Sequence, residues 1–471
     1  MSEQERKDIE SLYTDAHHWH INAGAETIHA KRMSGRFRTY KWYAASLWLS
    51  FFILPYFRIE DNQAILFDIP NRQFHLGSLT IWPQDVWMLS LVLILLAITL
   101  FAVTAVAGRV WCGYFCFQTV WTDLFTWLED KIEGNPIQRR KLNSGAWTVQ
   151  KLSKKLFKHL LWILISILTG VTFTAYFTDV YQLWVDVVSF QAPLIAWVTI
   201  GFFIFFTYVF AGFMREQVCF WLCPYARIQS VMVDKDTELP TYDLARGEPR
   251  GKVKRGNDNN QKGDCIDCRL CVGVCPTGVD IREGMQEGCI TCGMCIDACD
   301  SIMDKVNRPR GLIRYASQKE LSGETLPPVF KRPRVITYSV ILFLSIAGII
   351  YGLTHIPPVE LSVVHERQPL FTQMSDGSIQ NRYTIKAVNK TLDSLEFQLH
   401  VTGLDGINIK MPDGDTITLQ PEGIIPFHVF LRAIPAQLNN KKTEIRFILE
   451  SMNSTDKIKI TKESVFIGPE K

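Results

Sequence analysis

Two stretches decide the fold: CIDCRLCVGVCP at Cys265–Pro276 and CITCGMCIDACD at Cys289–Asp300. Each has the spacing C-x2-C-x2-C-x3-C, which is typical of bacterial ferredoxins with two four-iron clusters. Three thiolates two residues apart let a short loop fold around one corner of a cubane, and the fourth cysteine ligates the other cluster. The sequence therefore predicts two [4Fe-4S] sites, one with Cys265, Cys268, Cys271 and Cys299 and one with Cys275, Cys289, Cys292 and Cys295.

Structural zinc is the alternative interpretation, because zinc sites also use paired C-x2-C motifs. A zinc site needs four ligands, and these rarely have a three-plus-one spacing that occurs twice in succession. Pro276 follows the fourth cysteine of the first run, as in ferredoxins, whereas Asp300 follows that of the second run. The repeated spacing favours iron–sulfur clusters.

The composition predicts a membrane protein with soluble parts. The 471 residues are 47% hydrophobic, with a net charge of +3 and a mean hydropathy of +0.06. This charge is too small for a nucleic-acid binder, and no basic stripe with interleaved aromatic residues occurs. All 12 cysteines lie between Cys112 and Cys299, so they are interpreted as metal ligands or redox groups in a reducing compartment rather than as disulfides.

Five apolar stretches approach the roughly 20 residues that a helix needs to cross a bilayer. They are Lys41–Phe57, Val86–Ala107, His159–Phe177, Leu194–Met214 and Val335–Leu353. The first is the shortest and contains Pro55. The first forty residues are polar and show no cleavable signal peptide, so the first span is expected to act as its own insertion signal.

Basic residues predict the orientation of these spans. They gather before the first span, after the second and before the fifth, whereas the loops at 58–85 and 178–193 are short and lean acidic. The N-terminus and all the cysteines are therefore expected in the cytoplasm, and the C-terminus outside it.

The predicted fold is a multidomain integral membrane protein with five transmembrane helices, a cytoplasmic two-cluster ferredoxin domain and a C-terminal immunoglobulin-like β-sandwich. Alternating runs such as Arg382–Asn389 and Glu444–Glu450, separated by turn signals, predict about seven strands for the sandwich. The predicted segments are 1–40 (cytoplasmic N-terminal segment), 41–233 (helices 1–4), 234–334 (ferredoxin domain), 335–353 (helix 5) and 357–471 (exported domain).

Four further cysteines follow the second and fourth spans, in two C-x3-C pairs: Cys112 and Cys116, and Cys219 and Cys223. On a helix this spacing places both sulfurs on one face. Four converging thiols could hold a soft ion such as Cu(I), or cycle between dithiol and disulfide. The alternative is that they are inert, as cysteines in apolar helices often are. Histidines 17, 18, 20 and 29 in the polar N-terminal segment are interpreted as solvated rather than as metal ligands.

Several motifs, in this order along the chain, resemble the FixG/RdxA/CcoG family of cbb3-type cytochrome c oxidase accessory proteins. They are GRVWCGYFC (Gly108–Cys116), CFWLCPYARIQSVM (Cys219–Met232), the ferredoxin runs with CIDACDSIM (Cys295–Met303), and the trailing sandwich. One departure is Phe117, where the family usually has a proline such as Pro224.

The resemblance implies an inner-membrane protein of Gram-negative bacteria that reduces Cu(II) to Cu(I) for the oxidase. By position, it gives the eight ferredoxin cysteines to the clusters and Cys112, Cys116, Cys219 and Cys223 to copper handling or electron transfer. The expected partners are membrane lipid, copper ions, oxidase subunits or assembly factors, and an unidentified cytoplasmic electron donor. A quinol-linked electron conduit to a periplasmic reductase and a non-enzymatic assembly scaffold remain as alternatives.

Overall fold

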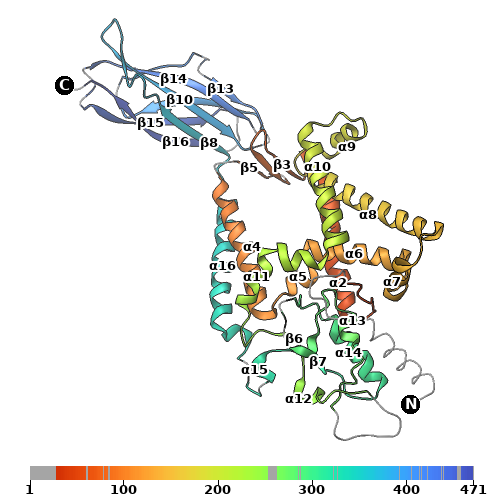
Figure 1. The fold of residues 1–471 in the computed structure, drawn as a ribbon. Helices are drawn as coiled ribbons and strands as arrows, with labels where there is room; N and C mark the ends of the chain where they lie inside the picture. Colours follow the sequence, from red (N-terminus) through yellow and green to blue (C-terminus); the bar gives the residue numbers. More distant parts are fainter. Residues whose placement is uncertain are drawn as a thin grey trace. The chain divides into compact units, whose positions relative to one another are not determined.

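The computed structural model describes residues 28–469 except 60–61, 78, 83–84, 253–262, 285, 287, 322, 326, 392, 405, 413, 415, 422, 436–437, 439 and 453–457. The chain forms two compact units, Met1–Ile349 and Ile350–Lys471. The first unit is mainly helical and contains every cysteine, and the second is a β-sandwich (Figure 1). Histidines 17, 18 and 20 lie outside the described residues.

Four helices in the described part of the chain are long and apolar enough to span a membrane. They are α4 (Val86–Ala107), α8 (Val149–Ala175), α10 (Leu194–Thr207) with its π-helical continuation η3 (Tyr208–Met214), and α16 (Pro333–Thr354). Four of the five predicted spans fall on these helices. Helix α8 begins before the predicted span because Thr148 caps it, accepting a hydrogen bond from the Lys151 amide at 3.2 Å.

The first predicted span, Lys41–Phe57, is not one long helix. It consists of the second half of α2 (Arg36–Ser46), α3 (Leu49–Ile53) and the 3-10 turn η1 (Leu54–Tyr56). Pro55 lies in the first turn of η1, where its missing N–H is tolerated, so the α-helix ends before it. A fifth membrane span stays a prediction.

Buried ion pairs join the helices that lie between the apolar ones. Glu129, on α6 (Phe117–Ile132), contacts three cations from α7 (Pro136–Ser144), α8 and the end of η3: Arg139 at 2.8 Å, Lys158 at 3.2 Å and Arg215 at 2.9 Å. Glu133 contacts Lys158 at 2.9 Å and Lys155 at 3.1 Å. Buried charges are tolerated when they are paired, so this network fixes α6 and α7 against α8.

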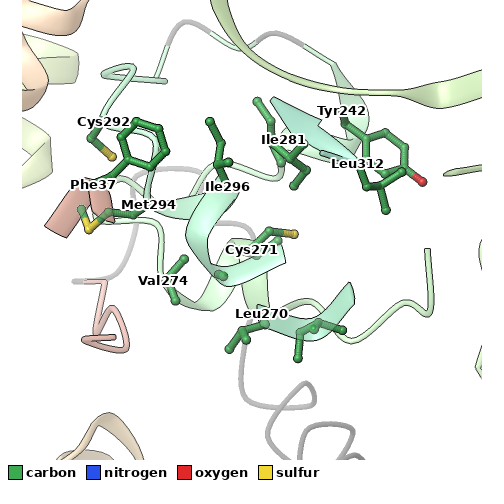
Figure 2. Close-up of a cluster of buried hydrophobic side chains, with 14 of the residues drawn as sticks. Phe37, Tyr242, Leu270, Cys271, Val274, Ile281, Cys292, Met294, Ile296 and Leu312 are labelled. Carbon is green, nitrogen blue, oxygen red and sulfur yellow. The ribbon is translucent and has the colours of Figure 1, made fainter. Parts of the chain in front are cut away.

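The ferredoxin part of the first unit follows α11 (Pro224–Met232). Strand β6 (Leu239–Tyr242) pairs antiparallel with β7 (Ile313–Ala316), and between them lie α12 (Leu244–Gly247), α13 (Leu270–Gly273), η5 (Ile281–Glu283) and α14 (Met294–Lys305). Leu270 and Leu312 fill its core together with the cysteines (Figure 2). Ile266 and Ile302 belong to the same core. The short helices α13 and α14 each begin within a cysteine run, so the core is built around the predicted cluster ligands.

The second unit is a sandwich of two antiparallel sheets, as the sequence predicts. One sheet has the order β12-β14-β10-β8, with β9 beside β10, and the other has the order β13-β11-β15-β16. The strands are β8 (Val359–His365), β9 (Thr372–Gln373), β10 (Ile379–Asn389), β11 (Leu395–Thr402), β12 (Asn408–Lys410), β13 (Thr416–Leu419), β14 (Ile424–Ala433), β15 (Lys442–Ser451) and β16 (Lys459–Ile467). Alternate residues such as Tyr383, Phe397 and Phe447 are fully buried between the sheets.

Candidate functional site

The first cluster cavity is lined by four cysteines: Cys265, Cys268, Cys271 and Cys299. Tyr242, two arginines (Arg269 and Arg282) and apolar side chains complete its wall. Arg282 pairs with Asp280 at 2.6 Å and is almost fully buried. The four cysteines therefore border a mainly apolar cavity with two arginines in its wall.

The second cluster cavity is lined by the other four ferredoxin cysteines, Cys275, Cys289, Cys292 and Cys295, and Cys271 also borders it. This is the grouping that the spacing predicts, with the fourth cysteine of each run in the cavity of the other run. Cys295 and Cys299 lie one turn apart on α14, so a single helix contributes to both cavities.

The two cysteine loops have the same backbone conformation. Asp267 and Arg269 in the first loop, and Thr291 and Gly293 at the equivalent positions of the second, all have positive φ between 49° and 70°. These left-handed residues turn backbone amides towards the sulfurs. The Leu270 amide donates to the Cys268 sulfur and the Thr291 amide to the Cys289 sulfur, which is the hydrogen bonding that tunes iron–sulfur clusters.

These residues fit four-iron clusters better than single ions. In the described part of the chain, no group of three or more His, Cys, Asp or Glu side chains could hold one metal ion. Each thiolate around a cubane binds a different iron, so the sulfurs lie farther apart than around one zinc ion. Burial raises the pKa of Cys268 to about 11 and that of Cys299 to about 12. Bound iron supplies the positive charge that keeps such thiols deprotonated.

The two C-x3-C pairs share a local structure that helical periodicity did not predict. Cys112 lies in α5 (Val110–Tyr114), but Cys116 is the extended residue that caps α6, with φ −58° and ψ 126°. Cys219 lies in the π-helix η4 (Val218–Leu222), and Cys223 caps α11 in the same way, with φ −81° and ψ 109°. The prediction that each pair lies on one face of one helix is wrong, because the helix ends at the second cysteine.

The replacement of proline by Phe117 does not change this geometry. Phe117 is the first residue of α6, and Pro224 is the first residue of α11. Proline is favoured at this position because its φ suits the first helical turn, but it is not required there. The two pairs are therefore structurally equivalent.

The four thiols come within electrostatic range of one another. Burial raises the pKa of Cys112 to about 12, and Cys116, Cys219 and Cys223 add to this rise. Burial also raises the pKa of Cys219 to about 12, whereas the positive charge of Arg109 opposes the rise. The Cys112 thiol donates to Gln229 Oε1 on α11 at 3.3 Å, which joins the two motifs. No three of these thiols form a single-ion site within the described chain, so copper binding by all four stays a prediction.

Helix α5 packs directly against the loop of the second cluster cavity. A Cβ atom on Gly113 would lie 2.5 Å from the Ile290 carbonyl oxygen and 3.2 Å from the Cys292 Cα. The Tyr114 hydroxyl donates to the Cys292 carbonyl at 3.0 Å. Only the absence of a side chain at Gly113 permits this approach, which places the first C-x3-C motif beside the second cluster cavity.

The N-terminal segment contributes contacts that the sequence did not reveal. The Phe37 amide donates to the Asp297 carboxylate on α14 at 2.8 Å, and the Lys31 amide donates to the Gly273 carbonyl at 2.7 Å. Figure 2 shows the Phe37 ring beside Cys292 and Met294. His29 is half-buried rather than solvated, and burial lowers its pKa to about 4. The sequence of α2 gave no signal for this face, because Lys41 is buried whereas Trp42 and Tyr43 are exposed.

Comparisons with known proteins agree with this site. Residues 214–318 match the family model of a 4Fe-4S dicluster domain, residues 89–136 match a 4Fe-4S binding domain, and residues 349–469 match the IG-like fold at the C-terminal of FixG. Protein RdxA of Cereibacter sphaeroides is 43% identical over 393 residues, which cover 81% of this chain and 83% of RdxA. The chain belongs to the FixG/RdxA family.

Other relatives extend the match over most of the chain. Nitrogen fixation protein FixG of Rhizobium meliloti is 36% identical over 475 residues, or 91% of each chain. Among solved structures, a FixG-related protein from Vibrio parahaemolyticus is 32% identical and covers 24% of this chain and 97% of its own, with a TM-score of 0.21. This FixG-family member is therefore a membrane protein that carries four-iron clusters and transfers electrons.

Proposed function

We propose that this protein reduces Cu(II) to Cu(I) for the assembly of a cbb3-type cytochrome c oxidase. Each Cu(II) takes one electron, which a cytoplasmic donor supplies by way of the iron–sulfur clusters. Cys112, Cys116, Cys219 and Cys223 receive the copper, because soft thiolates stabilise Cu(I) over Cu(II).

The packing of α5 on the loop of the second cluster cavity is the observation that carries the proposal. Gly113 and Tyr114 touch the backbone between two predicted cluster ligands, and Cys112 precedes them directly on the same short helix. Electrons in the second cavity thus need to cross only one helix to reach the thiols. The equivalent capping of Cys116 and Cys223 supports a shared role for the two motifs.

We also propose that the clusters lie in the cytoplasm and the sandwich in the periplasm of a bacterial inner membrane. Lys155 and Lys158 lie in the first half of α8, and Arg139 on the preceding α7 pairs with the same Glu129 as Lys158, as expected at the cytoplasmic end of a span. Five spans, the first formed by α2, α3 and η1, give this topology. The exported sandwich would then contact oxidase subunits or assembly factors.

Replacement of the four membrane-edge cysteines by serine tests the activity. We expect loss of Cu(II) reduction with unchanged cluster absorbance in anaerobically purified protein. Cys268→Ser is the matched comparison. It also replaces a cysteine sulfur by a serine oxygen, but at a predicted cluster ligand, so it should remove cluster absorbance as well as Cu(II) reduction. Unchanged Cu(II) reduction in the fourfold variant would refute the proposal. Normal oxidase assembly in cells with the cluster-deficient variant would instead support a scaffold.

A further inference from the structure

A cavity with both charged and apolar residues in its wall lies between the second cluster loops, Cys219 and the N-terminal segment. Its walls come from five parts of the first unit: the segment before α2, α2 itself, α6, the residues around η4, and the loops of the second cluster cavity. Cys219 forms one side of it, and Pro276, Thr277 and Ile290 form another. Thr277 also contacts the Cys275 sulfur at 3.3 Å. The cavity therefore borders both halves of the proposed electron path.

Three cations surround a single carboxylate in this cavity. Asp123 pairs with Arg32 at 2.7 Å, with Arg38 at 2.8 Å and with Lys41 at 3.6 Å. Their side chains are only 10%, 11% and 3% exposed, and that of Asp123 is 20% exposed. The group has two more positive charges than negative ones. Burial lowers the pKa of Arg32 even beside Asp123, which shows that one carboxylate does not offset the loss of water.

Several of these cationic donors have no hydrogen-bond partner. Among the buried side-chain atoms of the described residues, Lys41 Nζ, Arg38 Nε and Arg215 NH1 make no hydrogen bond. The wall also contains Glu216 and Arg215, one formal charge of each sign, so the excess of two positive charges remains. Each of these side chains has an ion-pair partner, but a buried donor atom that makes no hydrogen bond is still costly, and an anion in the cavity would supply the missing acceptor.

We propose that this cavity binds a phosphate group. Arg32 and Arg38 offer the forked guanidinium donors that recognise phosphate oxygens, Lys41 offers a point charge, and the Thr119 and Thr122 hydroxyls also lie in the wall. The cationic side chains favour an anion over Cu²⁺, so the ligand proposed here is a different species from the copper substrate, although Cys219 borders the cavity. Free phosphate, a phosphorylated small molecule and the headgroup of an anionic phospholipid share this chemistry. The inference rests on the cavity and does not require that the protein reduce copper.

A bound phosphate would also act on the electron path. A negative charge beside Thr277 stabilises the oxidised form of a cluster in the second cavity and lowers its reduction potential. The first cluster cavity does not share this wall, and Arg282 lies at its edge. Phosphate should therefore lower the reduction potential of the cluster in the second cavity and leave that of the cluster in the first cavity unchanged.

The test uses full-length protein that is purified anaerobically in detergent without phosphate. Thermal stability is measured against inorganic phosphate at constant ionic strength, with chloride as the competing salt, and cluster potentials are measured in the same series. In a parallel arm, the protein is placed in nanodiscs of phosphatidylglycerol or phosphatidylcholine. We expect saturable stabilisation by phosphate, or by phosphatidylglycerol over phosphatidylcholine if a lipid headgroup is the ligand. The former result identifies a soluble ligand, and the latter a lipid.

Two variants are expected to change the phosphate affinity in opposite directions. Lys41→Met removes one donor and should weaken the apparent phosphate affinity by about tenfold to a hundredfold. Asp123→Asn removes the competing carboxylate and should strengthen it. Lys331→Met is the matched control, because it removes an exposed lysine outside the cavity and should change nothing. The proposal is overturned if neither phosphate nor phosphatidylglycerol stabilises the wild type, or if Lys41→Met and Lys331→Met respond alike.

Discussion

Substitution of Gly113 by alanine would separate the thiol helix from the second cluster loop. The new Cβ would lie 2.5 Å from the Ile290 carbonyl oxygen, whereas real Cβ contacts essentially never fall below 3.0 Å. The obstacle is backbone between Cys289 and Cys292, which cannot move without moving the predicted ligands. Helix α5 must therefore shift away by at least 0.5 Å, the difference between these two distances.

The cost of this shift can be worked from the contacts that it disturbs. Overpacking of this kind costs about 1–3 kcal/mol. Weakening the Tyr114 hydrogen bond to the Cys292 carbonyl adds about 1 kcal/mol. The higher helix propensity of alanine over glycine offsets about 0.5–1 kcal/mol of this destabilisation. The net loss is about 2 kcal/mol, which is roughly a 30-fold change in the folded-to-unfolded ratio.

Cluster bleaching on heating measures the stability, and Cu(II) reduction measures the electron transfer. The clusters of Gly113→Ala should bleach at a lower temperature than those of the wild type, and the variant should reduce Cu(II) more slowly. Its iron content should be full while it is stored at about 4 °C. Gly201→Ala on α10 is the matched control, because a Cβ there meets nothing within 4 Å. If Gly113→Ala equals wild type in both assays, the close packing of α5 on the cluster loop does not matter, and the main support for copper reduction fails.

Three further predictions concern charged groups. Glu129→Gln should lower the free energy of unfolding by about 3–5 kcal/mol, because it removes the carboxylate that pairs with Arg139 and Arg215 and leaves Lys158 with Glu133 alone; thermal unfolding in detergent checks this, with the exposed Asp304→Asn as a neutral control. Arg282→Gln should lower the potential of only the cluster in the first cavity, because it removes the adjacent positive charge; a spectroscopic redox titration measures it, and an equal shift in Arg308→Gln would contradict the assignment. His29, with its pKa lowered by burial from 6.5 to about 4, stabilises the fold fully above pH 6.5 and progressively less as the pH falls towards 4. The wild type should therefore lose about 2 kcal/mol more than His29→Gln between pH 7 and pH 5, and parallel pH profiles of the two proteins would exclude this role.

The cysteine spacing was sufficient to predict the grouping around the two cavities, because ligand geometry restricts where such residues can lie. The sandwich was predictable for a similar reason, since its strands alternate regularly between buried and exposed residues. The local structure of the C-x3-C motifs was harder to predict, because their spacing suits one helix: Pro224 marks the break at Cys223, but no proline marks the one at Cys116. The contacts of Arg32, Phe37 and Lys41 depend on residues far along the chain, and no local pattern encodes such pairing.

The docking of α2 on α14 has a consequence for the order of synthesis. The Phe37 amide finds its acceptor, Asp297, 260 residues later in the chain. While a ribosome is still making the membrane helices, the N-terminal helix has no ferredoxin surface to bind. Its final position is therefore fixed only after the cysteine-rich part has emerged and folded. Membrane insertion alone would therefore not fix the position of α2.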